Sequence, residues 1–178
     1  MTDEPDVSEE QLTTPAALVL PPPLAALTEA FPDAAIEDSA TGQHVMRVPA
    51  AHLVEFAQAA RDGGFEMFVD LTAVDYYRRR PGPRFEVVIV LLSLRHNLRL
   101  RVLVGVDGDV PAAPSITGVY MGANFYEREV FDLFGIDFTG HPDLTRIMLP
   151  DDWEGHPLRK DHPVGSVPIQ FRDTHKVQ

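Results

Sequence analysis

Acidic and basic side chains that could do chemistry stand together in the stretch NFYEREVFDLFG, residues 124–135. Glu127 and Glu129 flank Arg128, and carboxylates are common general acids and bases. The local sequence offers neither carboxylate a catalytic partner, whereas Arg128 and Asp132 are one helical turn apart and close enough to form an ion pair. The stretch therefore favours a structural or docking role over catalysis, and we expect no catalytic residue in this chain.

The same stretch carries the signals of a short helix. Asn124 is predicted to be its N-cap, and Glu127 follows at the spacing of a capping box. Gly135 stands where a left-handed residue would end the helix. Helical spacing gathers large apolar side chains on one face, at Tyr126, Val130, Phe131, Leu133 and Phe134. Glu127 projects into this face, so we expect N–H groups of the first turn to satisfy its carboxylate.

Histidine and aspartate residues gather after the helix and could bind a metal ion. They are His141, His156, His162 and His175, with Asp143, Asp151, Asp152 and Asp161 nearby. No pair has the tight spacing of metal ligands, so the sequence predicts no metal site. The chain also contains no cysteine, which excludes disulfides, thiolate nucleophiles and cysteine-bound iron–sulfur clusters. A small metal-dependent hydrolase using these side chains remains the alternative from a different functional class.

The elements that must position the helix are predicted from hydrophobic periodicity. Helices are expected at residues 21–32 and 50–64, and strands at residues 34–39, 43–50, 65–77, 85–94 and 98–106. Only residues 95–97 separate the last two strands, a connection short enough for an antiparallel hairpin. The predicted fold class is therefore α+β, a mostly antiparallel sheet with packed helices, in a domain that spans residues 21–135.

The segment of residues 136–178 has many prolines and no sustained periodicity. It nevertheless carries large apolar side chains, at Ile136, Phe138, Leu144, Ile147, Met148, Leu149, Trp153, Leu158, Val164 and Phe171. A disordered tail rarely holds so much apolar surface. We therefore expect an extended proline-rich C-terminal arm that lies on another surface. That surface is either this chain's own sheet or, in better keeping with the length of the arm, another subunit.

Charge is unevenly distributed along the chain, whose formal net charge is −12. No lysine or arginine precedes Arg47, and residues 1–20 are predicted to be a disordered acidic tail. Residues 1–46 hold nine acids, whereas the chain from Arg47 onward carries 15 bases against 18 acids and is nearly neutral, so no basic surface favours a nucleic acid. Residues 78–80, three arginines, are interpreted as a solvated loop, with a contact to another protein of a complex as the alternative. No apolar run approaches the ~20 residues of a membrane span, so direct membrane insertion is not expected.

The run from Asn124 to Pro163 resembles the signature of the 30-kilodalton-type (C-type) subunit of proton-pumping NADH:quinone oxidoreductase (respiratory complex I). The matching residues are Glu127, Arg128, Glu129, Asp132, Gly135, Gly140, His141, Pro142, Asp143, Leu144, Arg146, Pro150, Asp152, Trp153, Pro157, Leu158, Arg159, Lys160 and Asp161. Their fixed order makes the resemblance specific. The one departure is at Asn124-Phe125, where relatives often carry a tryptophan.

The resemblance implies a non-redox structural subunit of the hydrophilic arm, peripheral to the cell membrane on its cytoplasmic side. The complex transfers electrons from NADH to quinone and couples this to proton translocation. This chain would carry no cofactor, while other subunits would carry FMN and iron–sulfur clusters.

The resemblance also assigns roles to residues. The structural signature would comprise Asn124, Glu127, Arg128, Glu129, Asp132 and Gly135. Docking on the quinone-site large subunit would use Gly140, His141, Pro142, Arg146, Trp153, Pro157, Leu158, Arg159, Lys160 and Asp161. The cluster-bearing subunits would be further partners. The alternative is the equivalent subunit of a membrane-bound hydrogenase or of another donor-linked quinone reductase.

Overall fold

The computed structural model describes residues 20–38 and 43–162. Its elements in chain order are α1 (Pro22–Ala30), β1 (Ala35–Asp38), β2 (His44–Arg47), the 3-10 turn η1 (Ala50–His52), α2 (Leu53–Asp62), β3 (Met67–Asp75), β4 (Phe85–Ser93), β5 (Leu98–Val106), β6 (Ala112–Pro114), α3 (Ala123–Phe134) and β7 (Asp137–Thr139). Each helix and strand predicted from the sequence is confirmed, with shifted ends. The predicted acidic tail lies outside the described residues except for Leu20.

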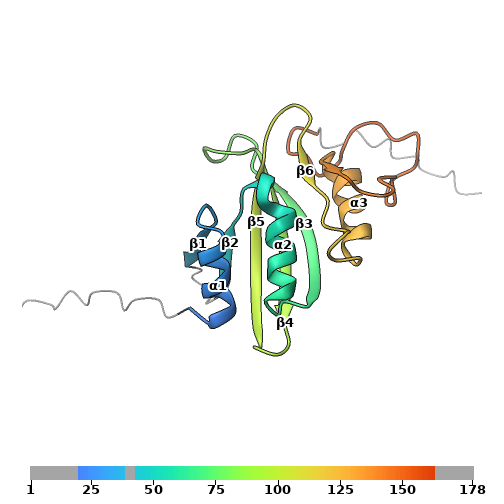
Figure 1. Ribbon diagram of the computed structural model, residues 1–178. Coiled ribbons are helices and arrows are strands. Elements are labelled where there is room, and N and C mark those ends of the chain that lie inside the picture. The colour runs from blue at the N-terminus through green and yellow to red at the C-terminus, as the bar shows by residue number, and fades with distance from the viewer. Residues whose placement is uncertain (1–19, 39–42, 163–178) are drawn as a thin grey trace, which may run out of the picture.

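A five-stranded sheet with the order β1-β2-β5-β4-β3 forms the centre of the molecule (Figure 1). Neighbouring strands are antiparallel, except that β2 runs parallel to β5. The two long strands β4 and β5 pair from Phe85 opposite Val106 to Ser93 opposite Leu98. Asn97 takes a left-handed φ of 50° in the turn that joins them. The α+β class with a mostly antiparallel sheet is therefore confirmed.

The apolar core lies between this sheet and the helices α1 and α2, which cover one of its faces (Figure 1). Side chains alternate along a strand, so every second residue of β4 and β5 points to the core. These are Val87, Ile89, Leu91, Leu100, Val102 and Val104. From α2, residues at helical spacing pack against them, namely Leu53, Phe56, Ala57 and Ala60. Each large apolar side chain buried in this way contributes about 1.5–3 kcal/mol.

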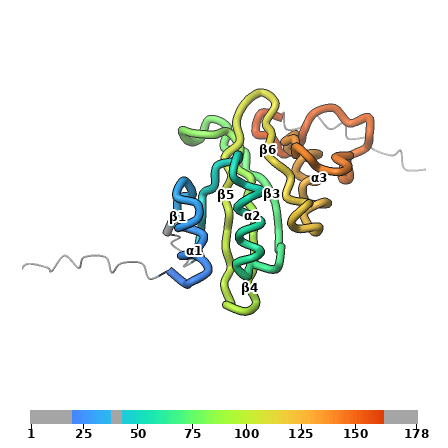
Figure 2. The backbone as a smooth tube through the Cα atoms, in the orientation of Figure 1, coloured from blue at the N-terminus to red at the C-terminus, as the bar shows by residue number. Residues whose placement is uncertain are grey.

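Helix α3 lies against the edge strand β3, and a second, two-stranded sheet follows it. Strands β6 and β7 run parallel, with Ala113 opposite Phe138. Ile136 and Phe138 are buried in the core. Both were predicted to belong to an arm that lies either on this chain's own sheet or on another subunit. For these two residues the first alternative applies, because β7 pairs with β6 and brings their side chains into the core. The chain after β7 then loops back beside α3 (Figure 2).

Candidate docking site around helix α3

Asp132, in the last turn of α3, organises the segment that follows the helix. Its carboxylate is fully buried. One oxygen, Oδ2, accepts the backbone N–H groups of Ile147, Met148 and Leu149 at 3.2, 2.8 and 2.9 Å. The other, Oδ1, accepts Nη1 of Arg146 at 2.8 Å. Burial alone would raise the pKa of Asp132, but these four donors outweigh it and hold that pKa below its ordinary value.

Arg128 lies one turn before Asp132 and holds the same segment. Its Nε donates to the carbonyl oxygen of Thr145 at 3.0 Å, and its Nη2 donates to the hydroxyl of Thr145 at 2.8 Å. The predicted ion pair between Arg128 and Asp132 is wrong, because residues 146–149 saturate the carboxylate and Arg128 turns to Thr145 instead. Both members of the predicted pair therefore bind the returning chain rather than each other.

The end of α3 is closed by residues from further along the segment. Gly135 has the predicted left-handed conformation, with φ 68° and ψ 34°. The Nδ1–H of His156 donates to the carbonyl oxygen of Asp132 at 2.9 Å, and Arg159 donates to the carbonyl oxygens of Phe134 and Gly135. These carbonyls have no partner within the helix, so the segment satisfies them. A Cβ atom at Gly135 would collide with the side chains of His156 and Arg159, so a larger residue there would push both away from the end of the helix.

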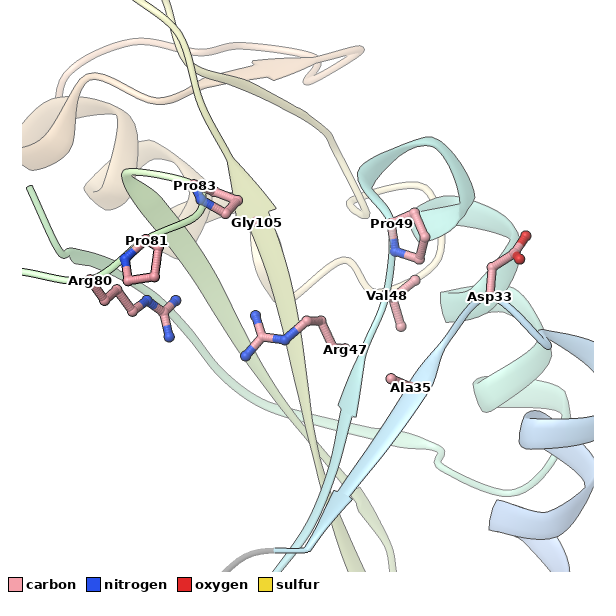
Figure 3. Close-up of a pocket in the computed structure, with 9 residues that line it drawn as sticks. All are labelled: Asp33, Ala35, Arg47, Val48, Pro49, Arg80, Pro81, Pro83 and Gly105. Atoms are coloured by element: carbon pink, nitrogen blue, oxygen red, sulfur yellow. The ribbon is translucent and has the colours of Figure 1, made fainter.

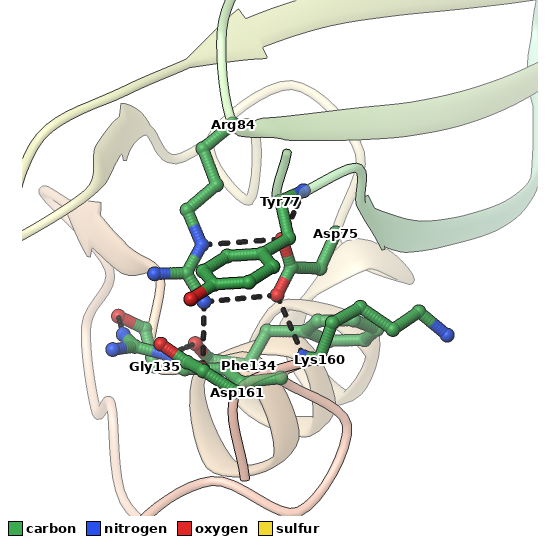
Figure 4. A network of polar contacts seen from close by, with 8 residues as sticks. Asp75, Tyr77, Arg84, Phe134, Gly135, Lys160 and Asp161 are labelled. Atoms are coloured by element: carbon green, nitrogen blue, oxygen red, sulfur yellow. Dashed lines mark hydrogen bonds and ion pairs between the residues drawn. The ribbon is translucent and has the colours of Figure 1, made fainter. Parts of the chain in front are cut away.

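A second polar cluster ties the end of the segment to the sheet (Figure 4). Asp75, the buried last residue of β3, accepts Nε of Arg84 at 3.2 Å and Nη2 at 3.0 Å. It also accepts the backbone N–H groups of Tyr77 and Lys160, each at 2.8 Å. Nη2 of Arg84 reaches Asp161 as well, at 2.7 Å. Burial opposes ionisation, but these donors hold the pKa of Asp75 below its ordinary value.

Asp75 and Arg84 were not among the residues predicted from the sequence to be functional. One signal was present, because strand alternation puts Asp75 on the same face as Leu71 and Ala73, both of which are buried. A carboxylate on a buried face needs donors within the fold. Its partner in the segment was not predictable, since Lys160 lies 85 residues further along the chain.

Glu127 is buried in α3, as predicted, but its carboxylate has other partners than those expected. The helix begins at Ala123, with Gly122 as its N-cap and no side-chain cap. The capping box predicted from Asn124 is therefore wrong, because that residue is already inside the helix. Oε1 of Glu127 accepts the N–H of Ile116 at 2.8 Å, while Oε2 has no hydrogen-bond partner among the described residues. Burial raises the pKa of Glu127 above its ordinary value.

The remaining predicted residues lie between and beside these clusters. His141 accepts the N–H of Asp143 at Nδ1, and its Nε2 lies 3.2 Å from the carbonyl oxygen of Asn124. Trp153 is half-buried, and its indole Nε1 is buried without a partner among the described residues. Glu129 is half-buried and takes part in neither cluster. Of the others, Gly140, Pro142 and Leu158 are exposed and Pro157 is half-buried.

The candidate metal-binding side chains do not converge. Within residues 20–38 and 43–162, no group of three or more histidine, aspartate or glutamate residues is placed to hold a metal ion. Both ring nitrogens of His141 and Nδ1 of His156 face backbone groups instead, and His175 lies outside the described residues. In the same part of the chain, no helix combines the length and the apolar character needed to cross a membrane.

Residues 46–167 match the protein family described as respiratory-chain NADH dehydrogenase, 30 Kd subunit. The chain belongs to this family. The C-type subunit of NADH-quinone oxidoreductase from Roseiflexus sp. (strain RS-1) is 46% identical to it over 149 residues, 82% of this chain and 84% of that protein. The protein of the same name from Roseiflexus castenholzii is 45% identical over 159 residues, 87% of this chain and 90% of that protein. The resemblance noted in the sequence is thereby confirmed.

Two solved structures are similar to this member of the 30 Kd subunit family. One is the trypsin-resistant fragment (1–134) of Nqo5, with a TM-score of 0.62 and 36% identity over 68% of this chain and 99% of that chain. The other is a chain in the structure of the membrane-bound sulfane sulfur reductase, an archaeal respiratory membrane complex. It has a TM-score of 0.70 and 23% identity over 87% of this chain and 96% of that chain. At this identity the second similarity concerns the fold alone.

Proposed function

We propose that this chain is the 30-kilodalton-type subunit of an NADH:quinone oxidoreductase, with a structural role in the hydrophilic arm and without catalytic residues or a cofactor of its own. The family and the names of its relatives support this assignment over the equivalent subunit of a membrane-bound hydrogenase. The chain holds the quinone-site large subunit in register with the cluster-bearing subunits. Through the complex it lies on the cytoplasmic side of the cell membrane, peripheral to the bilayer.

The loop of residues 145–149, here called the docking knuckle, carries this proposal. Its backbone N–H groups converge on Asp132 inside the molecule. The side chains of Ile147 and Met148 remain 37% and 60% exposed. Apolar side chains presented to solvent on a firmly held loop are typical of a protein–protein interface rather than of an enzyme site.

The clamp around Asp132 also prepares the knuckle for binding. Ordering a loop at an interface costs about 0.5–1.5 kcal/mol for each flexible side chain that is immobilised. Asp132 and Arg128 fix the backbone of the knuckle before any partner arrives. Less of the binding free energy is then lost to ordering, so a few apolar side chains suffice to hold the partner.

The polar residues predicted to dock on the partner act mainly within this chain. Arg159 and Asp161 bind α3 and Arg84, respectively. We assign docking instead to apolar groups of the segment after β7, Ile147, Met148 and Leu158, the last being 46% exposed. The polar residues then act as positioning residues that aim these groups outward.

Substituting Met148→Asp in the intact complex tests the proposal. A charge at the centre of an apolar contact costs several kcal/mol, so the variant should be lost from complexes purified from solubilised membranes. Leu94→Asp is the matched control, because Leu94 is 63% exposed at the β4–β5 turn, away from the knuckle. Normal incorporation of Met148→Asp, with an NADH-binding flavoprotein co-purifying, would overturn the docking assignment.

A truncation separates docking from folding. The cut belongs after Gly140, because Ile136 and Phe138 are part of the core. The shortened chain should keep its circular dichroism spectrum and cooperative unfolding, yet fail to enter the complex. Full incorporation of this folded fragment would show that the segment is not the docking element.

A further inference from the structure

A hollow lies between strands β1 and β2 and the loop that follows β3 (Figure 3). Its volume is about 450 Å³. Apolar walls come from Ala35, Val48, Pro49, Pro81 and Pro83. The guanidinium groups of Arg47 and Arg80 both extend into it (Figure 3). The hollow is remote in sequence from the docking knuckle, and the proposed function makes no use of it.

The two guanidinium groups keep free donors. Arg47 uses Nε on Glu37 and Nη1 on Glu86, and Arg80 uses Nη2 on Glu86. Each guanidinium has five N–H donors in a planar fork that suits a carboxylate. Nη2 of Arg47 and both Nε and Nη1 of Arg80 have no hydrogen-bond partner among the described residues. An incoming carboxylate would find these donors ready.

The neighbouring loop adds uncompensated positive charge. Residues 76–84 contain four arginines and no acid, and two of these, Arg80 and Arg84, pair with carboxylates of other elements. Glu37 and Glu86 balance the two arginines inside the hollow, and Asp33 lies on its rim. Arg78 and Arg79 are exposed and form no ion pair with the described residues. The hollow and its rim therefore favour an anionic ligand that also has apolar groups.

The amino-terminal segment of this chain, residues 1–19, has the complementary chemistry. It holds no base and carries carboxylates at Asp3, Glu4, Asp6, Glu9 and Glu10. Pro5 and Val7 alternate with these acids and suit the proline-rich walls. The segment joins α1, which lies beside β1, a strand that lines the hollow (Figure 1). At ~3.3 Å per extended residue the chain between Asp6 and Leu20 spans about 45 Å, which is ample reach.

We propose that residues 1–19 bind back into this hollow, with their carboxylates on Arg47, Arg80 and the flanking Arg78 and Arg79. The acidic segment is then an intramolecular ligand that covers the guanidinium cluster in the isolated chain. Another protein of the complex with a similar acidic peptide would compete for the same donors. Because both groups are near the surface, the contact weakens when salt shortens the Debye length from ~10 Å at 0.1 M to ~3 Å at 1 M.

Distances between two spin labels on the full chain, measured by electron paramagnetic resonance, test this proposal. The chain contains no cysteine, so labels placed through Ser8→Cys and Ala51→Cys have no background. Ala51 is exposed and lies two residues after Pro49, outside the lining of the hollow. A short-distance population is expected at 0.1 M NaCl and should be lost at 1 M. The short-distance population should also be lost when the five acids of residues 1–10 are replaced by their amides. The double substitution Arg78→Gln/Arg79→Gln should have the same effect.

Matched controls remove the same charges elsewhere. Asp107→Asn/Asp109→Asn in the exposed β5–β6 loop, and Arg95→Gln/Arg99→Gln near the β4–β5 turn, should keep the short distance. A distribution that does not respond to salt or to the neutralised acids would overturn the proposal. A short distance between separate chains, one labelled at each position, would also overturn it by showing that the contact joins two copies.

Discussion

The sheet and the segment after β7 are held by opposite kinds of interaction. In the sheet, apolar side chains such as Ile89 and Val102 meet across strands and pack beneath α2. In the segment, carboxylates of the domain collect backbone N–H groups, at Asp132 from residues 147–149 and at Asp75 from Lys160. Apolar side chains point inward in the first region, whereas Met148 points outward in the second.

This difference explains how one small chain can fold and still offer an apolar surface. Apolar packing is non-directional and draws its free energy from removing surface from water. Carboxylate clamps are directional and hold a backbone without burying its side chains. The clamps therefore leave Ile147, Met148 and Leu158 available to a partner. They also make the stability of the segment depend on charge and pH, because its backbone N–H groups are held by the carboxylates of Asp132 and Asp75.

The largest loss of stability is expected from a substitution in the apolar core. Phe56→Ala removes a fully buried ring from α2 and should lower the free energy of unfolding by about 3–5 kcal/mol. Urea unfolding followed by circular dichroism measures this loss. Leu94→Ala, at an exposed site, should change stability by about 0.5 kcal/mol or less. Equal effects of the two substitutions would contradict the assignment of the core.

The next largest effect is expected from a substitution that removes the clamp around Asp132 and leaves the sheet folded. Asp132→Ala removes the acceptor for three backbone N–H groups and for Arg146. Left buried, these donors would cost about 1–3 kcal/mol each, so the knuckle should instead open into water. Amide exchange at residues 147–149 should accelerate by about 10–100-fold, while amides of β4 and β5 keep their protection.

Asp137→Ala is the control for this measurement, because Asp137 is an exposed acid on β7 of the same region. It should leave exchange at residues 147–149 unchanged. Loss of protection throughout the sheet in Asp132→Ala would show that the two regions unfold as one unit. The contrast between them would then be wrong.

The elements of the sheet could be predicted because their signals are local. A continuous apolar run marks β4, alternation of apolar and polar residues marks the start of β5, and helical spacing marks α2. Each of these signals lies within a few consecutive residues. Strands β6 and β7 have three residues each and no measurable periodicity. They were missed for that reason, and with them the burial of Ile136 and Phe138.

The clamps could not be predicted, because their donors lie far along the chain. Helical spacing correctly placed Gly135 at the end of α3, yet it paired Arg128 with Asp132, since it considers only neighbours on one helix. The true partners are loop residues whose position depends on the tertiary path. The capping box failed for a related reason. The start of α3 is set by the preceding turns at residues 116–123, not by Asn124.

Acidification should destabilise the segment after β7 before the sheet, and the effect should be smaller than that of Asp132→Ala. The pKa values of Asp132 and Asp75 are below their ordinary value in the folded chain. Their stabilisation is therefore complete above the unfolded pKa of ~3.9 and is lost as the pH falls through that value toward the folded pKa. As the pH falls below ~4, the backbone amides of the segment should lose their protection from hydrogen exchange before those of the sheet do. Simultaneous loss of both regions at every pH would contradict separate stabilisation.

The smallest effect comes from replacing Glu127 with glutamine. Burial raises the pKa of Glu127, which lies on the same helix as Asp132. A carboxyl with a raised folded pKa contributes stability below its unfolded pKa of ~4.3 and loses it as the pH rises toward the folded value. Glu127→Gln stays neutral and still accepts the N–H of Ile116. We therefore expect Gln to match the natural residue at pH 4 and to be more stable at pH 8, by about 1 kcal/mol or less.

Glu127→Ala separates the hydrogen bond from the charge. It leaves the N–H of Ile116 without its acceptor and a cavity beside it, so it should be less stable than Gln at both pH values, by about 1–3 kcal/mol. Urea unfolding of the three chains at pH 4 and pH 8 measures both differences. If Gln were instead destabilised at pH 8 as strongly as Ala, an ionised carboxylate would be holding Ile116. Glu127 would then belong with Asp132 and Asp75 among the charged clamps rather than with the apolar region.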